Sequence, residues 1–76
     1  MKTADEMFRM LGYKPSEFED VYIKSVNDKN IRICIGHGTP IAKWTYDKFG
    51  ETVWIAFTQE EVIACAQLIR EMEDTK

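Results

Sequence analysis

The hydrophobic residues of this chain follow two different periods. Four residues near the N-terminus recur at helical spacing: Ala4, Met7, Phe8 and Leu11. Five residues near the C-terminus do the same: Val62, Cys65, Ala66, Ile69 and Met72. Four segments between them have the alternation or the composition of β-strands: 21–26, 31–36, 41–46 and 52–57. The pattern therefore predicts a helix, four strands and a second helix.

Capping residues and turn residues mark the ends of these elements. Each helix begins with a capping box, formed by Thr3 with Glu6 and by Thr58 with Glu61. Gly12 then stands where a left-handed C-cap ends the first helix, and we expect Tyr13 to pack back on that helix. Three segments with turn chemistry separate the strands: 27–30, 36–40 and 47–51. Residues 14–20 are interpreted as a connector.

The order of elements is α-β-β-β-β-α, and it predicts one fold class. Short links between strands favour an antiparallel meander, because parallel pairs need longer crossovers. Two helices can cover one face of such a sheet. We therefore expect a single α+β domain over residues 1–76. It would be a two-layer structure with a four-stranded antiparallel meander sheet and both helices on one face.

Strand alternation then assigns side chains to the two faces of the sheet. The row expected to face the helices is Val21, Ile23, Ile31, Ile33, Ile35, Val53, Ile55 and Phe57. The row expected on the open face is Tyr22, Lys24, Arg32, Cys34, Thr52, Trp54 and Ala56. Segment 41–46 is ambiguous, because two sets of side chains compete for the core: Ala42, Trp44 and Tyr46, or Ile41, Lys43 and Thr45.

Composition narrows the classes of function. The net charge is −3, with acidic ends and a mildly basic middle, so a long nucleic acid is not an expected partner. Two cysteines and one histidine give no metal-ligand spacing, and no metal or cofactor is expected. Cys65 lies on the hydrophobic stripe of a helix and is expected to be a buried, reduced thiol.

The compartment is predicted from the same composition. No hydrophobic run approaches the ~20 residues that a bilayer span requires, so no membrane association is expected. The first ten residues carry acidic side chains where a signal peptide has basic ones. We therefore expect a cytoplasmic protein.

The segment GHGTP, residues 36–40, is the strongest candidate for a reactive loop. It joins two strands, whereas a phosphate-binding loop opens a helix, and it lacks the spacing of a nucleotide-binding motif. No nucleophile or second acid can be assigned to His37, although Cys34 is close in sequence. We interpret the loop as a turn, with His37 and Thr39 at the rim of a binding site, and predict no enzymatic activity.

The aromatic side chains expected on the open face allow three interpretations. Lysine and arginine stems can shield the rings from water. A homo-oligomer, most simply a dimer, can bury them against a second copy. Alternatively, the face can bind a small anionic nucleotide, with Trp44 or Trp54 stacking on the base and Arg32, Lys24 or Lys43 neutralising phosphate.

One similarity of this sequence to a known family bears on the origin of the protein more than on its mechanism. The opening MKTADEMFRMLGY, with a strand-rich middle and a closing helix that begins TQEEV, resembles a family of small phage and prophage proteins of Firmicutes. The specific match covers about the first thirteen residues. The resemblance implies an origin in a mobile element and expression in the host cytosol, and it assigns no functional residues. Small phage proteins often act by binding, for example by blocking a host defence protein or by sequestering a signalling nucleotide.

These observations together predict a non-enzymatic interaction protein. Its open face, with Tyr22, Arg32 and Trp54 as anchors, would bind a second copy, a host protein or both, and could counter host defence. The alternative is a small-nucleotide-binding protein that acts as a sponge for a nucleotide signal.

Overall fold

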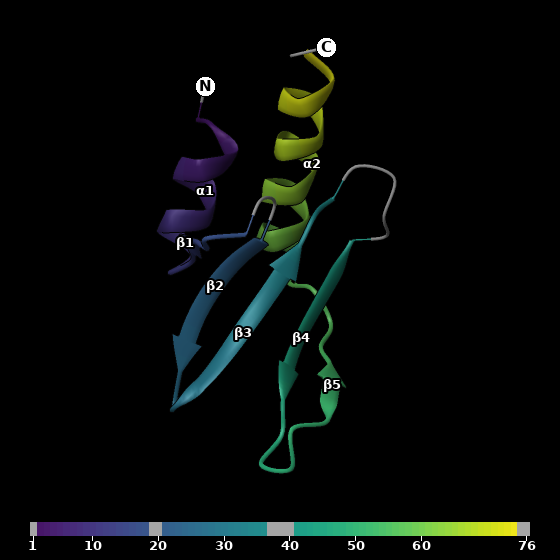
Figure 1. Ribbon diagram of the computed structural model, residues 1–76. Coiled ribbons are helices and arrows are strands. Elements are labelled where there is room, and N and C mark those ends of the chain that lie inside the picture. Colours follow the sequence, from purple (N-terminus) through teal and green to yellow (C-terminus); the bar gives the residue numbers. More distant parts are fainter. Residues whose placement is uncertain (1, 19–20, 37–40, 75–76) are drawn as a thin grey trace.

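The computed structural model describes residues 2–18, 21–36 and 41–74. These residues form two helices and five strands (Figure 1): α1 (Ala4–Met10), β1 (Lys14–Pro15), β2 (Val21–Val26), β3 (Lys29–Cys34), β4 (Ala42–Tyr46), β5 (Thr52–Trp54) and α2 (Gln59–Asp74). The strands form one antiparallel sheet in chain order, from β1 to β5. The predicted α+β class is confirmed, but the sheet has one strand more than the four expected.

The additional strand comes from the segment interpreted as a connector. Lys14 pairs with Ile23 and Pro15 pairs with Tyr22, so β1 forms one edge of the sheet. Proline is tolerated there because an edge strand does not need every N–H for pairing. Four boundaries also differ from the prediction: β3 runs from Lys29 to Cys34 and not over 31–36, β4 begins at Ala42 and not at 41, and β5 ends at Trp54 and not at 57.

The predicted ends of α1 are confirmed. Thr3 and Glu6 form the capping box in both directions. Gly12 has a φ of +91°, the left-handed conformation that a C-terminal cap requires. The N–H of Tyr13 then donates to the Phe8 carbonyl at 2.9 Å, and its buried ring meets the Phe8 ring edge-on, with centroids 5.9 Å apart. The tyrosine is thus held against the helix that precedes it.

The hairpin between β2 and β3 corrects the predicted face of β2. Asn27 and Asp28 have φ values of 50° and 66°, as a two-residue hairpin turn of type I′ requires. This turn places Tyr22 opposite Ile33, and paired residues share a face. Tyr22 and Lys24 therefore face the helices, and Val21 and Ile23 lie on the open face. The prediction was wrong for all four residues, because it did not take into account that the number of residues in the turn determines which residues of the two strands share a face.

Packing between α1 and the sheet follows from this register. The Tyr22 ring stacks on Phe8 of α1, with centroids 4.2 Å apart and planes 18° apart. The ammonium group of Lys24 lies 5.3 Å from the centroid of the Tyr13 ring. The eight buried hydrophobic residues form one cluster between helices and sheet: Ala4, Phe8, Tyr13, Tyr22, Ile33, Ile35, Ala64 and Cys65. Burial raises the pKa of the Cys65 thiol to about 11, as expected of an unreactive core cysteine.

The buried side of α2 differs from its predicted hydrophobic stripe. Cys65 is buried as expected, but Val62 is 53% exposed. The other buried residues of the helix are Ala64 and Glu61, so a carboxylate expected only as part of the capping box belongs to the buried side of the helix. The hydrogen bonds of this carboxylate position α2 against the sheet.

Glu61 is a hydrogen-bonding centre that joins three parts of the chain. Its side chain accepts from the N–H of Thr58 at 2.9 Å, from the Lys43 ammonium group at 2.7 Å and from the Tyr13 hydroxyl. Glu61 is only 4% exposed. Burial by itself raises the pKa of this carboxyl, but the bonds from Lys43, Thr58 and Tyr13 outweigh it, so the pKa lies below its usual value.

The same ion pair resolves the ambiguity of β4. Lys43 and Thr45 are buried on the face covered by the helices, and Thr45 donates to the Asn30 carbonyl at 2.9 Å. Strand alternation then sends Trp44 and Tyr46 to the open face. Figure 1 shows both helices at one end of the sheet, with the β2–β3 and β4–β5 hairpins projecting beyond them. The helices thus cover part of one face and leave the other face open.

We expect Glu61→Gln to lower the free energy of unfolding by about 3–5 kcal/mol, because it leaves the buried Lys43 charge without its partner. The matched control is Glu60→Gln, a neighbouring exposed residue in the first turn of α2, for which we expect about 1 kcal/mol or less. Urea unfolding followed by circular dichroism measures both. Equal losses for the two variants would show that the ion pair does not stabilise the fold.

The pH dependence of stability should report the same carboxylate. Because the folded-state pKa of Glu61 is lowered, its stabilising contribution is present above the unfolded-state pKa and is lost as the pH falls through the folded-state pKa. We expect the difference in unfolding free energy between the wild type and Glu61→Gln to shrink below pH ~4.5. Urea unfolding across an acidic pH series measures this difference. A constant difference would contradict the assignment.

Candidate functional site

A row of paired side chains crosses the open face of the sheet. Ile23 of β2 pairs with Arg32 of β3, Arg32 pairs with Trp44 of β4, and Trp44 pairs with Trp54 of β5. Because directly paired residues share a face, the four side chains stand side by side. Two aromatic rings and one guanidinium group are thereby brought together from three strands.

The aromatic part of this row is largely exposed to solvent. The rings of Trp44 and Trp54 lie with centroids 6.3 Å apart and planes at 58°. Trp54 is 71% exposed, whereas Trp44 is half-buried between its neighbours. The guanidinium carbon of Arg32 lies 5.1 Å from the centroid of the Tyr46 ring, within the range of a cation–π contact. Arg32 therefore joins the tryptophan pair to Tyr46.

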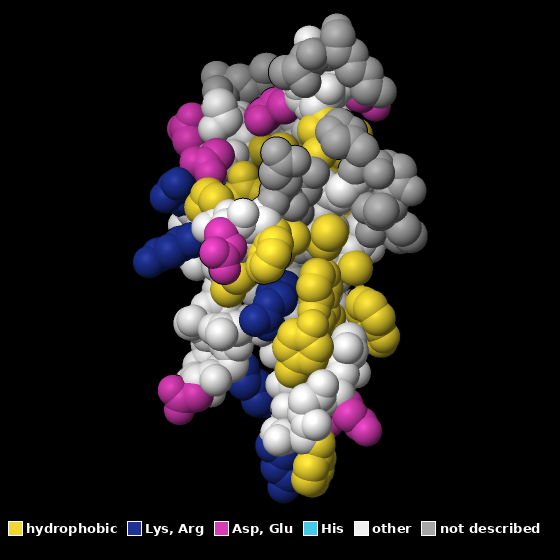
Figure 2. Space-filling model, in the orientation of Figure 1, with side chains coloured by type: hydrophobic (Ala, Val, Ile, Leu, Met, Phe, Trp, Pro, Cys, Tyr) yellow, Lys and Arg dark blue, Asp and Glu magenta, His cyan; other side chains and the backbone are white. Residues whose placement is uncertain are grey.

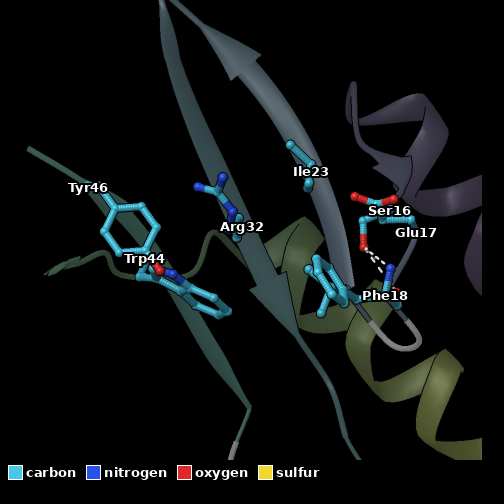
Figure 3. Close-up of a pocket in the computed structure, with 8 residues that line it drawn as sticks. Ser16, Glu17, Phe18, Ile23, Arg32, Trp44 and Tyr46 are labelled. Carbon is cyan, nitrogen blue, oxygen red and sulfur yellow. Dashed lines mark hydrogen bonds between the residues drawn. The ribbon is translucent and has the colours of Figure 1, made fainter. Parts of the chain in front are cut away.

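Part of this row borders a pocket of about 450 Å³, here called the aromatic groove, whose lining includes Trp44 and Arg32 but not Trp54. Trp44 and Tyr46 form one side, Ile23 and Arg32 lie along the floor, and residues 16–18 form the opposite side (Figure 3). Figure 2 shows hydrophobic side chains gathered over this part of the molecule, with basic side chains among them. The groove is apolar except for a few charged and polar groups.

The far wall of the groove is held in place by a local turn. The Phe18 N–H donates to the Ser16 hydroxyl oxygen at 3.1 Å, and the Ser16 hydroxyl lies 3.0 Å from the Phe18 carbonyl. The Ser16 N–H also donates to the Val21 carbonyl at 2.9 Å. These bonds hold the Phe18 ring on the groove although it is 69% exposed. Phe18 was not among the predicted site residues, and the only signal for it in the sequence was the turn-forming serine two residues earlier.

Arg32 is a charged group with unused donors. It makes one long hydrogen bond to the Asn30 carbonyl, at 3.3 Å, and no described carboxylate lies within ion-pair distance of it. Glu17 lines the same groove from the opposite wall. The groove thus offers a guanidinium group to an anionic side chain or phosphate, with aromatic rings beside it.

The structure brings together three of the seven predicted site residues: Arg32, Trp44 and Trp54. Tyr22 and Lys24 lie on the opposite face of the sheet, where Tyr22 is part of the core and Lys24 lies over the Tyr13 ring. Lys43, considered for phosphate binding, is buried against Glu61. His37 and Thr39 lie outside the described residues. The groove gains Phe18, Ile23 and Tyr46 instead.

A second hydrophobic surface lies on the helices. Met10 of α1 and Val62 and Ile63 of α2 are each more than half exposed. Two shallow hollows border them, of about 250 and 240 Å³. Neither is lined by an aromatic residue together with an arginine, so the aromatic groove is the better candidate site.

The described part of the chain contains no cluster of three or more His, Cys, Asp or Glu side chains suited to a metal ion. None of its helices combines the length and hydrophobicity that a membrane span requires. Comparison with known proteins adds no assignment: no family model, no curated protein and no solved structure matches the chain. The groove is therefore interpreted from its own chemistry.

Proposed function

We propose that the protein is a non-enzymatic interaction protein whose partner docks into the aromatic groove. The observation that supports this proposal is the gathering of Phe18, Trp44 and Tyr46 with Arg32 in one groove, on a face that no described element covers. Exposed aromatic rings lower the stability of the free protein in water unless a partner covers them, and contiguous hydrophobic patches usually mark interaction sites. Aromatic and arginine residues are also those that dominate binding energy at interfaces.

The chemistry of the groove favours one kind of partner surface. Arg32 lies among rings, where water is partly displaced, so a carboxylate that reaches it gains a stronger bond than at an open surface. Hydrophobic side chains beside that carboxylate fit against Trp44 and Ile23. We infer that the partner presents an acidic residue flanked by hydrophobic ones. The N-terminal resemblance to phage proteins favours a host protein over an unrelated ligand.

A photo-crosslinking amino acid at Phe18 should capture this partner in host cells. We expect one discrete covalent adduct, and we expect its yield to fall at least tenfold with Arg32→Ala, because loss of a central arginine typically costs about 2 kcal/mol or more. The readout is the mass of the adduct and the identity of its peptides. The same yield with and without Arg32 would contradict docking in the groove.

The matched control is the same amino acid at Phe49. That residue is 78% exposed but lies in the turn between β4 and β5, beside Lys48 and away from the groove. An equal pattern of adducts from Phe49 and Phe18 would show that crosslinking depends only on exposure and not on docking in the groove.

A second candidate function is binding of a small anionic nucleotide. The specific observation is the volume of the groove, which lies within the 300–1,000 Å³ range of ligand pockets, with one guanidinium group beside exposed rings. Lys24 and Lys43 do not contribute, since both lie on the other face, so Arg32 alone would contact phosphate. One cation favours a mononucleotide or a cyclic dinucleotide over a polymer.

Tryptophan fluorescence distinguishes this second function. If a nucleotide stacks on Trp44 or Trp54, titration with mono- and cyclic dinucleotides should quench emission to saturation, and Arg32→Ala should weaken binding about tenfold or more. Lys48→Ala, which removes an exposed cation outside the groove, should not. Absence of quenching at millimolar nucleotide would exclude nucleotide binding in the groove.

A further inference from the structure

The two edges of the sheet differ in chemistry. The β1 edge is two residues long and carries Lys14 and Pro15, both of which oppose pairing with another strand. The β5 edge begins a six-residue segment, 52–57, that contains no charge and no proline. All three residues of β5 are exposed. Both edge strands are short, but only β5 carries neither a charge nor a proline that would oppose pairing.

The hydrogen bonds around β5 show which main-chain groups are free. The Ile55 N–H donates to the Lys43 carbonyl at 2.9 Å, and the Asp47 N–H donates to the Glu51 carbonyl at 2.9 Å. These bonds flank the paired residues Trp44–Trp54 and Tyr46–Thr52, so both are non-hydrogen-bonded pairs. In such pairs the N–H and C=O groups point away from the partner strand. Thr52 and Trp54 therefore direct theirs to the outer edge.

We propose that a second copy of the chain pairs antiparallel with this edge, about a two-fold axis at Trp54. A residue on the axis pairs with itself, and Trp54 directs both its N–H and its C=O outward, so each copy would donate one bond and accept one there. The edge thus has the self-complementary pattern that a two-fold contact requires.

Charge favours a second copy as the occupant. The nearest charged residue is Glu51, three positions from the axis, so the two copies of Glu51 would lie about 20 Å apart at ~3.4 Å per residue. That separation exceeds the ~8 Å screening length at physiological salt. No like charges would meet at the contact, although the whole chain carries −3. An edge suited to a charged peptide would present complementary charge, and segment 52–57 presents none.

The pairing would join the two open faces. A two-fold axis perpendicular to the sheet keeps both faces on the same side, so the row from Ile23 to Trp54 would continue into the second copy. The two Arg32 side chains would lie about 24 Å apart, five strand spacings of ~4.8 Å. Since the contact uses main-chain groups, the aromatic grooves stay open, and the pairing does not depend on the function proposed above.

The test uses the full chain and variants that act on the edge alone. In this register the Thr52 N–H faces the Ala56 carbonyl of the second copy, which also accepts from Lys43 of its own chain at 3.2 Å. Thr52→Pro removes this outward N–H without removing a bond to β4, and Thr52→Val is its matched control. Trp54→Lys places two like charges beside the axis at a residue that is solvent-exposed in the monomer. Sedimentation equilibrium from micromolar to millimolar protein should show dimers for the wild type and Thr52→Val. Both other variants should weaken the dimer at least tenfold, and Arg32→Ala should not.

Amide hydrogen exchange identifies the contact directly. We expect protection of the Thr52 and Trp54 amides to increase with protein concentration, whereas the amides of Val53 and Ile55, which point to β4, stay protected throughout. A wild type that remains monomeric at millimolar concentration would overturn the proposal. A dimer that leaves the Trp54 amide unprotected, or that Arg32→Ala abolishes while Thr52→Pro does not, would overturn it too. Protection of the Trp54 amide only in the presence of a host protein would replace the second copy by a foreign strand.

Discussion

The carboxylate of Glu61 is the point at which the separate parts of this small chain meet. It caps the start of α2 through Thr58, neutralises Lys43 of β4 and accepts from Tyr13, which follows α1. A buried ion pair adds little net stability by comparison with hydrophobic packing, but the loss of one partner is costly. In a chain of this size, with few buried hydrophobic residues, such a group restricts the number of ways in which helices and sheet can be combined.

The ion pair also determines what the open face contains. Lys43 must point to the helices to reach Glu61, and the two-residue period of a strand then sends Trp44 and Tyr46 to the other side. Two large rings that could have filled the core are placed on the open face, next to Arg32. The polar contact inside and the aromatic groove outside are thus consequences of one register, and a slip of β4 by one residue would exchange them.

Part of this arrangement could be predicted from the sequence, where local rules decide. The capping boxes, the left-handed Gly12 and the outward position of Arg32 and Trp54 follow from residue type and alternation. The face of Tyr22 could also have been derived, from the even number of turn residues at Asn27 and Asp28. Which side chains of β4 face the helices could not be derived, because this depends on a contact between Lys43 and a residue 18 positions away. Phe18 was not predictable, since its exposure depends on how an irregular segment passes the sheet.

The contact between Tyr13 and Glu61 has a consequence for biosynthesis. The two residues are 48 positions apart, so the first helix is synthesised long before α2, against which it packs. At about 5–20 residues per second, a ribosome needs roughly 2–10 s to add that length of chain. For most of this interval Tyr22, which stacks on Phe8, has already been synthesised, but α2 has not. The side of the first helix that packs against α2 therefore stays uncovered for seconds while the stretch between them is synthesised.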